Sequence, residues 1–219
     1  MYKYILVAIL ATSALLRLTF LNSHMDTLYG DEVALGYNAY AIKETLHDEF
    51  GRFMPLQFES WGDQKNPVYI YATALVQLVT GPTMASVRIP SAIAGILAVY
   101  LTYRLAIILK LGSVVALVSS FFLAVNPWHI HISRGGYEAN VALTLGLGSV
   151  VLLLTRRYAL SALLLAISTY TYYTTKMFAP LLLLFTWIYM INWSKYKNSI
   201  KPFIKYWLLA LILVLPIIY

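Results

Sequence analysis

Ionisable side chains stand beside long apolar runs at several points of this sequence, and together they could act on an anionic lipid. The carboxylates are Asp31, Glu32 and Glu138, and the cations are Lys65, Arg88, Arg134 and Lys176. Ionisable groups close to a membrane interior are costly, so they usually mark a pathway or a site. A carboxylate can take the proton from an attacking hydroxyl, and ammonium and guanidinium groups bind phosphate. The set therefore predicts a site that handles an anionic lipid head group.

The Asp31-Glu32 pair follows Gly30 and precedes a helical pattern, so two interpretations are open. Asp31 could cap the helix while Glu32 complements its dipole. Alternatively, one carboxylate at the bilayer edge is a general base that activates an acceptor hydroxyl.

Each cation also has a simpler interpretation. Lys65 and Lys176 could snorkel to the interface, Lys176 from the aromatic stretch 169–175, and Arg88 could anchor a helix at the head groups. Arg134 and Glu138 are four apart and could form an intrahelical ion pair after an interruption at Asn126-Pro127. As a site, the tyrosines of 169–175 would line a sugar or lipid groove and the cations would bind phosphate.

Two histidines, His129 and His131, could ligate a metal, but on this Trp-containing interfacial stretch we interpret them as membrane-belt residues. Cysteine is absent, which excludes disulfides, thiolate nucleophiles and cysteine metal sites. No glycine-rich phosphate loop or nucleophile elbow is present, which argues against nucleotide chemistry.

Composition indicates the elements that must hold these groups. Of 219 residues, 60% are hydrophobic and 11% charged, with mean hydropathy +0.71, which excludes a water-soluble globule. The net charge of +7 is typical of loops that face an anionic leaflet rather than of nucleic-acid binding. We therefore expect an all-α, polytopic transmembrane bundle.

The distribution of basic residues predicts about seven spans. Lysines and arginines of short loops mark the cytoplasmic side, and the basic clusters of this chain share one side only if the apolar run 67–80 does not cross. The first run is then an uncleaved helix, and 67–80 is an interfacial or re-entrant helix. The apolar runs are 4–21, 67–80, 89–109, 113–132, 139–154, 158–175, 177–193 and 206–219.

Eight of the nine acidic residues lie between the first two spans, in a polar and aromatic segment at 22–66. A loop of about 45 residues is too long for a passive turn and typical of a functional segment. Its stretch 34–42 predicts a short amphipathic helix. The last run, 206–219, is short for a span, so we interpret residues 1–219 as a single transmembrane module, the N-terminal part of a longer chain.

Taken in order, several motifs resemble one family of membrane enzymes. They are Arg17 late in the first helix, Gly30-Asp31-Glu32, Lys65-Asn66-Pro67, Val87-Arg88-Ile89-Pro90-Ser91-Ala92, and Ser133-Arg134 followed by Glu138. This resembles the polytopic glycosyltransferases of the GT-C fold, in particular the group of dolichyl-phosphate-mannose protein mannosyltransferases and aminoarabinose transferases. The resemblance covers nearly the whole chain, as the N-terminal transmembrane module.

The resemblance implies transfer of a sugar from a polyprenyl-phosphate carrier to a hydroxyl of a protein, lipid or glycan, on the external face of the cell membrane and with inversion. By the same resemblance Asp31 is the base with Glu32 beside it, Glu138 is a second-loop acid, and Lys65 contacts the carrier phosphate. Arg88 and Arg134 match structural or charge-pairing arginines, and Lys176 matches a lysine at the end of a later helix. We group the four cations as the donor phosphate site.

The sequence departs from the family pattern at two neighbouring positions. Gln64 stands where aminoarabinose transferases carry a carboxylate associated with metal, although Asp63 is adjacent, and Asn66 replaces a usual proline. We therefore assign no metal ligand, with a divalent metal left open as a cofactor.

Two other classes of function compete with the enzyme. Intramembrane charges can line the route of a transporter or lipid flippase, but here they gather at one face and no half-repeat is visible. A non-catalytic fragment that binds the lipid carrier is the third possibility, because the chain looks short for such an enzyme.

Overall fold

The structure, a computed structural model, describes residues 2–23, 27–60 and 62–192, and also 205, 208–210 and 212–213. Asp26, most of the lysine cluster after 194 and most of the expected span 206–219 lie outside the described residues. The described part is mainly helical, as expected.

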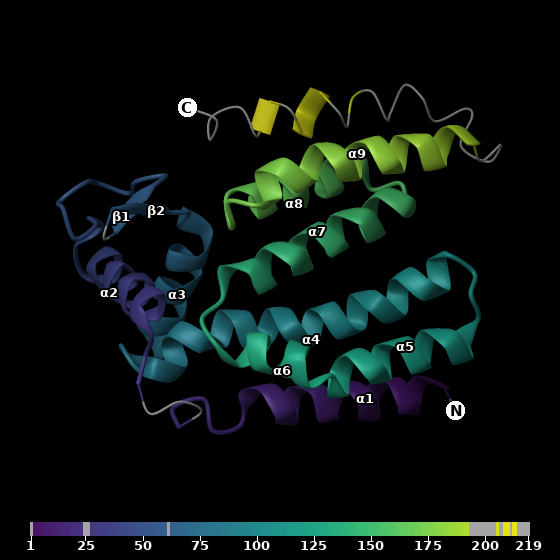
Figure 1. The fold of residues 1–219 in the computed structure, drawn as a ribbon, viewed down its shortest axis with the longest axis horizontal. Coiled ribbons are helices and arrows are strands. Elements are labelled where there is room, and N and C mark those ends of the chain that lie inside the picture. Colours follow the sequence, from purple (N-terminus) through teal and green to yellow (C-terminus); the bar gives the residue numbers. More distant parts are fainter. Residues whose placement is uncertain are drawn as a thin grey trace.

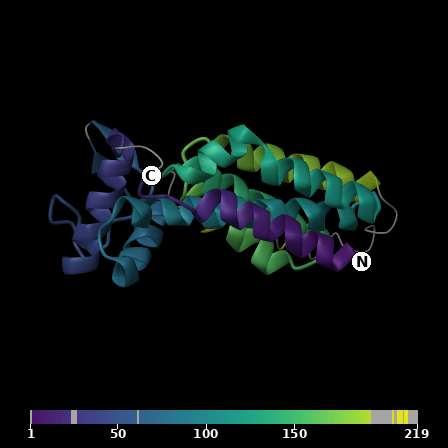
Figure 2. The same ribbon diagram turned by 90° about the horizontal axis from the view of Figure 1, so that it is seen from below.

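Two groups of elements make up the fold, and Figures 1 and 2 show one at the end of the other. The helices of the elongated bundle are α1 (Tyr2–Leu18), α4 (Met84–Ile108), α5 (Ser113–Val125), α6 (Pro127–Arg134), α7 (Glu138–Leu154), α8 (Tyr158–Thr169) and α9 (Thr175–Asn192). The remaining elements, which we call the cap, are α2 (Gly30–Thr45), β1 (Phe58–Ser60), β2 (Asp63–Lys65) and α3 (Pro67–Thr80).

A small apolar core holds the cap together. Leu35 of α2, Phe58 of β1 and Ile70 of α3 are fully buried against one another. The helix expected at 34–42 is confirmed and is longer than predicted, because it begins at Gly30 and ends at Thr45. Its other face is open, with Tyr37 and Tyr40 exposed.

A two-stranded hairpin lies between α2 and α3 of the cap. Strands β1 and β2 pair antiparallel, with Phe58 opposite Lys65 and Ser60 opposite Asp63. Alternation along β2 sends the side chains of Asp63 and Lys65 to the same side. Pro67 then begins α3 at a position where its missing N–H costs nothing.

The cap lies at one end of the bundle and the basic turns lie at the other, as Figure 1 shows. The turn from α4 to α5 carries Lys110, and the turn from α7 to α8 carries Arg156 and Arg157. Helix α3 packs against α2 within the cap and against α4 of the bundle. That 67–80 does not cross the membrane stays a prediction.

The seven-span count stays a prediction. Among the described residues, α4 is long and apolar enough to span a bilayer by itself, and α5 with α6 qualifies only as a pair bent by 58°. Helices α3, α7 and α8 are apolar but shorter. The bend confirms the interruption predicted at Asn126-Pro127, where the Asn126 side chain accepts from His129 N at 2.9 Å and caps α6.

Polar side chains tie the apolar helices to each other. Asn140 Nδ2 of α7 donates to the Ser91 carbonyl of α4 at 2.8 Å, and Ser168 Oγ of α8 donates to the Ala142 carbonyl at 2.8 Å. Ser149 and Ser161 exchange bonds between α7 and α8. Such small hydroxyl and amide contacts are the usual means of joining helices in lipid.

Candidate active site

The first turn of α2 presents two adjacent carboxylates in opposite environments. Tyr29, not Asp31, is the N-cap residue, so the interpretation of Asp31 as the helix cap is wrong. Glu32 accepts from the Tyr29 backbone N–H at 3.4 Å, and its side chain is 0% exposed. The side chain of Asp31 is 55% exposed. Asp31 is thus the carboxylate of the pair that a substrate can reach.

Glu32 and Arg88 form a buried ion pair between the cap and the bundle. Arg88 Nε donates to Glu32 Oε1 at 2.9 Å and Nη2 donates to Oε2 at 3.1 Å. The Gly136 backbone N–H also donates to Oε1, at 2.7 Å. Arg88 further binds the carbonyls of Leu21 and Thr27 at 2.8 and 3.2 Å. We call this network the Glu32–Arg88 clamp.

The clamp changes the interpretation of Arg88. Its side chain is 0% exposed, and Nε, Nη1 and Nη2 all donate to protein oxygens. The contact with a donor phosphate that the sequence predicts for Arg88 is therefore not available in this structure. The charge-pairing interpretation of Arg88 fits the geometry.

Lys65 stands between two carboxylates at the junction of β2 and α3. Its Nζ lies 2.9 Å from Asp31 Oδ1 and 3.0 Å from Asp63 Oδ2. Partial burial opposes its charge, but the hydrogen bonds that Lys65 donates to Asp31 and Asp63 outweigh this and raise the pKa of Lys65. The same bond from Lys65 lowers the pKa of Asp63. The ammonium therefore stays charged at the edge of the cap.

Glu138 comes directly before the apolar run 139–154 and begins α7. Its Oε1 is buried and makes no hydrogen bond within the described structure. Burial raises the pKa of this carboxyl from 4.5 to about 7, against the opposing attraction of Lys65. Close by, the rings of Tyr29 and Tyr137 stack with centroids 5.4 Å apart. Burial, and then Asp31, raise the pKa of the Tyr29 hydroxyl.

Arg134 and Glu138 lie on different helices, so the interpretation of an intrahelical ion pair is wrong. Arg134 ends α6 and Glu138 begins α7, with a glycine-containing turn between them. Arg134 Nη1 donates to the Leu16 carbonyl near the end of α1, at 2.8 Å. The residue joins α6 to α1, and its side chain also has other contacts.

His129 contacts a buried arginine of the first helix. Its Nδ1 lies 2.8 Å from Arg17 Nη2, and Arg17 Nη1 donates to the Ala124 carbonyl at 2.9 Å, near the end of α5. A guanidinium at the end of a helix is stabilised by the helix dipole. In the part of the chain that the structure describes, no group of three His, Asp or Glu side chains could hold a metal ion.

Lys176 is at the start of α9, at the cap end of the bundle in Figure 1. Its Nζ lies 5.3 Å from the centroid of the Tyr173 ring, and burial lowers the pKa of this lysine. The Tyr170 carbonyl accepts from Val68 N at 3.4 Å, which joins this region to the start of α3. The aromatic stretch predicted from the sequence therefore reaches the end of the bundle that meets the cap, where Lys65 lies. We call this end the rim.

A second feature of this rim is a groove of about 440 Å³ between α7, α8 and α9. Its walls include Leu143, Leu147 and Leu165, and Tyr172 with Thr175 marks its polar end. The next residue after Thr175 is Lys176. Among the described residues, Tyr172 is the one tyrosine that lines this groove, and the tyrosine-lined sugar or lipid groove stays a prediction.

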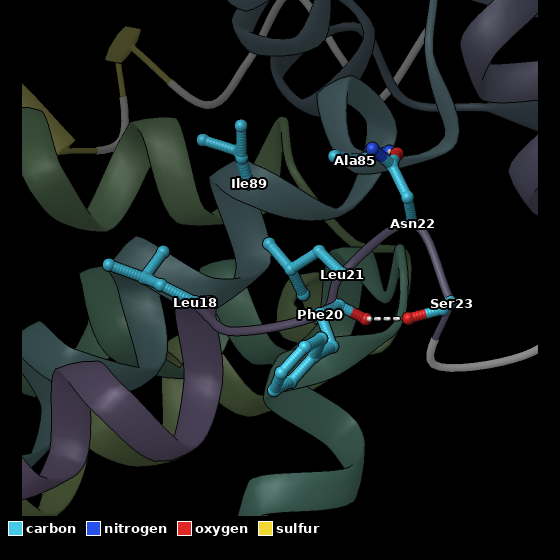
Figure 3. Close-up of a pocket in the computed structure, with 7 residues that line it drawn as sticks. All are labelled: Leu18, Phe20, Leu21, Asn22, Ser23, Ala85 and Ile89. Carbon is cyan, nitrogen blue, oxygen red and sulfur yellow. Dashed lines mark hydrogen bonds between the residues drawn. The ribbon is translucent and has the colours of Figure 1, made fainter.

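Figure 3 shows another pocket at this end, of about 550 Å³, where α1 ends and α4 begins. Leu18, Leu21 and Ile89 line it, and Asn22 Oδ1 accepts from Ala85 N at 2.8 Å. Among the described residues that line it, none has an ionisable side chain.

Sequence reasoning missed three contributors to the site. Asp63 was noted only as a neighbour of Gln64, yet it pairs with Lys65. Gly136 donates to the clamp, and Tyr29 stacks on Tyr137. The paired glycines at 135–136 were a signal of close backbone approach, since a Cβ on Gly136 would meet Glu32 Cγ at 2.9 Å.

Comparison with known proteins shows the family to which the chain belongs. Residues 5–135, more than half of the chain, match the family described as dolichyl-phosphate-mannose-protein mannosyltransferase. Over 143 residues the chain is 30% identical to the "Putative mannosyltransferase YycA" of Bacillus subtilis (strain 168), a match that covers 64% of this chain and 20% of that protein. The chain therefore spans about a fifth of the length of this curated relative. A search of the solved structures gave no match. With its motifs in family order and its matching residues 5–135, the chain belongs to the dolichyl-phosphate-mannose-protein mannosyltransferase family of membrane glycosyltransferases.

Proposed function

We propose that the protein transfers a sugar from a polyprenyl-phosphate donor to an acceptor hydroxyl, with Asp31 as the general base. The observation that carries the proposal is the contact between Asp31 and Lys65. An exposed carboxylate lies 2.9 Å from a largely buried ammonium, at the rim where the cap meets the bundle. This places a proton acceptor beside a group that can bind phosphate.

In the proposed reaction, the acceptor oxygen attacks the anomeric carbon while Asp31 takes its proton. The bond from that carbon to the acceptor oxygen forms as the bond to the phosphate oxygen breaks. Attack from the face opposite the phosphate inverts the anomeric configuration. Polyprenyl phosphate leaves with the bonding electron pair, and the sugar–phosphate bond supplies the driving force.

Lys65 is proposed to stabilise the departing phosphate. Negative charge grows on the phosphate during the reaction, and a fixed ammonium stabilises that charge more than it stabilises the ground state. The two carboxylates that bracket Lys65 hold it in place before the donor arrives. Lys176 is the proposed second phosphate contact, because it follows the polar end of the α7–α8–α9 groove.

The clamp residues have a positioning role in this proposal. Glu32 and Arg88 are fully buried and fix the first turn of α2 against α4, so they set the direction of Asp31. Arg134 fixes α6 against α1 in the same way. Glu138 is retained as a second acid, because its buried Oε1 makes no hydrogen bond within the described residues.

The α7–α8–α9 groove is the proposed binding site for the first isoprene units of the donor. Its volume of about 440 Å³ is within the usual range for ligand sites, and its walls are leucine, valine and alanine. A tail that lies there would bring its phosphate to the level of Tyr172 and Lys176. The reaction would then occur at the head-group level, with the tail in lipid.

The proposed location follows the charge distribution. Basic turns at the end opposite the cap favour a cytoplasmic position for that end, so the cap with Asp31 faces the external side of the membrane. The chain would then be the N-terminal, multi-pass module of the enzyme, and a protein hydroxyl is the acceptor class that fits the family.

The experiment that tests the base compares two carboxylates that both bind Lys65. Full-length protein in membranes is given a polyprenyl-phosphate-linked mannose and an acceptor, and transfer is measured for Asp31→Asn and Asp63→Asn. Loss of a general base is expected to reduce kcat by about 100-fold or more in Asp31→Asn. Asp63→Asn weakens one contact of Lys65 but removes no base, so its loss of kcat should be much smaller than that of Asp31→Asn. Unchanged transfer by Asp31→Asn in correctly inserted protein would remove Asp31 from the mechanism.

A further inference from the structure

A groove at the end of the bundle opposite the cap has the chemistry of a lipid site. It has a volume of about 560 Å³ and lies between α4, α7 and α8. Leu101, Leu152 and Leu164 form apolar walls, and Gly148 lies at its floor. Arg104 and Arg157 line it as well. The groove therefore combines an apolar interior with two cations.

The two cations come from different helices and are open to a ligand. Arg104 is in the last turns of α4, and Arg157 is the residue that precedes α8. Both side chains are exposed. Arg104 Nη1 donates to the Tyr100 hydroxyl at 3.2 Å, and its guanidinium lies 6.0 Å from the centroid of that ring. Tyr100, itself part of the lining, thus holds Arg104 at the groove.

Gly148 of α7 faces side chains of the two neighbouring helices at a point of close approach. A Cβ on Gly148 would lie 3.1 Å from Leu164 Cδ1 and 3.6 Å from Leu101 Cδ1. A larger side chain at this position would therefore fill the space between the two leucines. This position offers a way to close the groove without changing its charge.

We propose that this groove binds an anionic phospholipid, with an acyl chain along the leucine walls and the phosphate between Arg104 and Arg157. Charge complementarity selects the occupant: an apolar peptide or neutral lipid would fill the walls but leave both guanidiniums without an anionic partner. Basic pockets between helices on the cytoplasmic side are a recurrent setting for anionic head groups. The site is separate from the proposed reaction centre, since the cap lies at the other end of the bundle.

The test measures lipid retention by the purified full-length protein. Native mass spectrometry is carried out in detergent with added phosphatidylglycerol or with phosphatidylcholine of the same acyl chains. The wild type should retain phosphatidylglycerol in preference to phosphatidylcholine. Arg104→Gln and Arg157→Gln should each weaken phosphatidylglycerol binding by about fivefold, as expected for one arginine near an anionic surface. Arg104→Lys should restore part of the binding.

Two further variants separate the groove from general charge. Lys3→Gln removes one cation from the same end of the bundle but outside the groove lining, so retention should not change. Gly148→Leu keeps every charge and fills the groove, so it should weaken retention of both lipids. If Gly148→Leu lowers the unfolding temperature, the arginine variants alone carry the test.

Three outcomes would overturn the proposal. They are equal retention of the two lipids by the wild type, undiminished phosphatidylglycerol binding by the double variant Arg104→Gln, Arg157→Gln, and displacement of the lipid by millimolar inorganic phosphate alone. The last result would identify the ligand as a free anion. Absence of any bound lipid in the full-length protein would overturn the proposal as well.

Discussion

The carboxylate of Glu32 and the guanidinium of Arg88 meet at two points, 2.9 and 3.1 Å apart, in a fully buried pair 56 residues apart in sequence. The pair joins the first turn of the cap helix α2 to the first turns of α4. Because Asp31 directly precedes Glu32 in α2, the direction of the exposed carboxylate depends on this buried contact.

Neutralising one member of this pair should destabilise the protein more than neutralising its exposed neighbour. Glu32→Gln leaves the Arg88 charge buried without its counter-charge, a loss of about 3–5 kcal/mol in the free energy of unfolding. Asp31→Asn, at a half-exposed position, should change it by less than about 1 kcal/mol. Thermal unfolding in detergent measures both. Equal unfolding temperatures for the two variants would contradict the role of the clamp.

A methyl group at Gly136 should also disturb the clamp. The new Cβ would lie 2.9 Å from Glu32 Cγ and 3.2 Å from Val87 Cγ1, so the turn between α6 and α7 must move away from Glu32. We expect Gly136→Ala to lower both stability and transfer. Gly30→Ala is the matched control, because a Cβ there meets nothing within 4 Å although it adjoins Asp31. A similar loss from both changes would count against a specific effect at Gly136.

Glu138 should give the protein a stability that falls as the pH rises. Burial raises its pKa from 4.5 to about 7, so between these values the folded state keeps a proton that the unfolded state releases. The folded state is therefore favoured most below pH 4.5 and loses at most about 3 kcal/mol by pH 7 through this group. Glu138→Gln should remove this part of the pH dependence of the unfolding temperature. An identical profile for wild type and variant would show that Glu138 is already charged at low pH.

The α7–α8–α9 groove offers a test of the proposed donor tail. A Cβ on Gly146 would have its nearest neighbour, Ser168 Oγ, at 3.8 Å, so a leucine can be placed in the groove. We expect Gly146→Leu to raise the KM for the lipid-linked donor with little change in stability. Val7→Phe adds bulk at an exposed position of α1 outside the groove and should leave the KM unchanged. An unaltered KM in Gly146→Leu would place the tail elsewhere.

Some elements of this molecule could be predicted from the sequence, and others could not. The helix at 34–42 and the break at Asn126-Pro127 were predictable, because side-chain periodicity and proline act locally. The hairpin that brings Asp63 to Lys65 was not, because its strands of three residues are too short for a periodic signal. The contacts of Arg88 were not predictable either, because only the fold shows that Glu32 and two carbonyls accept hydrogen bonds from its guanidinium.

The central claim is that the cap and the loop before α7 share one side of the membrane, where Asp31, Lys65 and Glu138 form one site. The chain has no cysteine, so single cysteines report without background. In intact cells, a membrane-impermeant maleimide should label cysteines at Phe53 of the cap and His131 of α6, both exposed. A cysteine at Leu111, in the opposite turn, should react only after permeabilisation. Labelling of Phe53→Cys and His131→Cys from opposite sides would contradict the shared site.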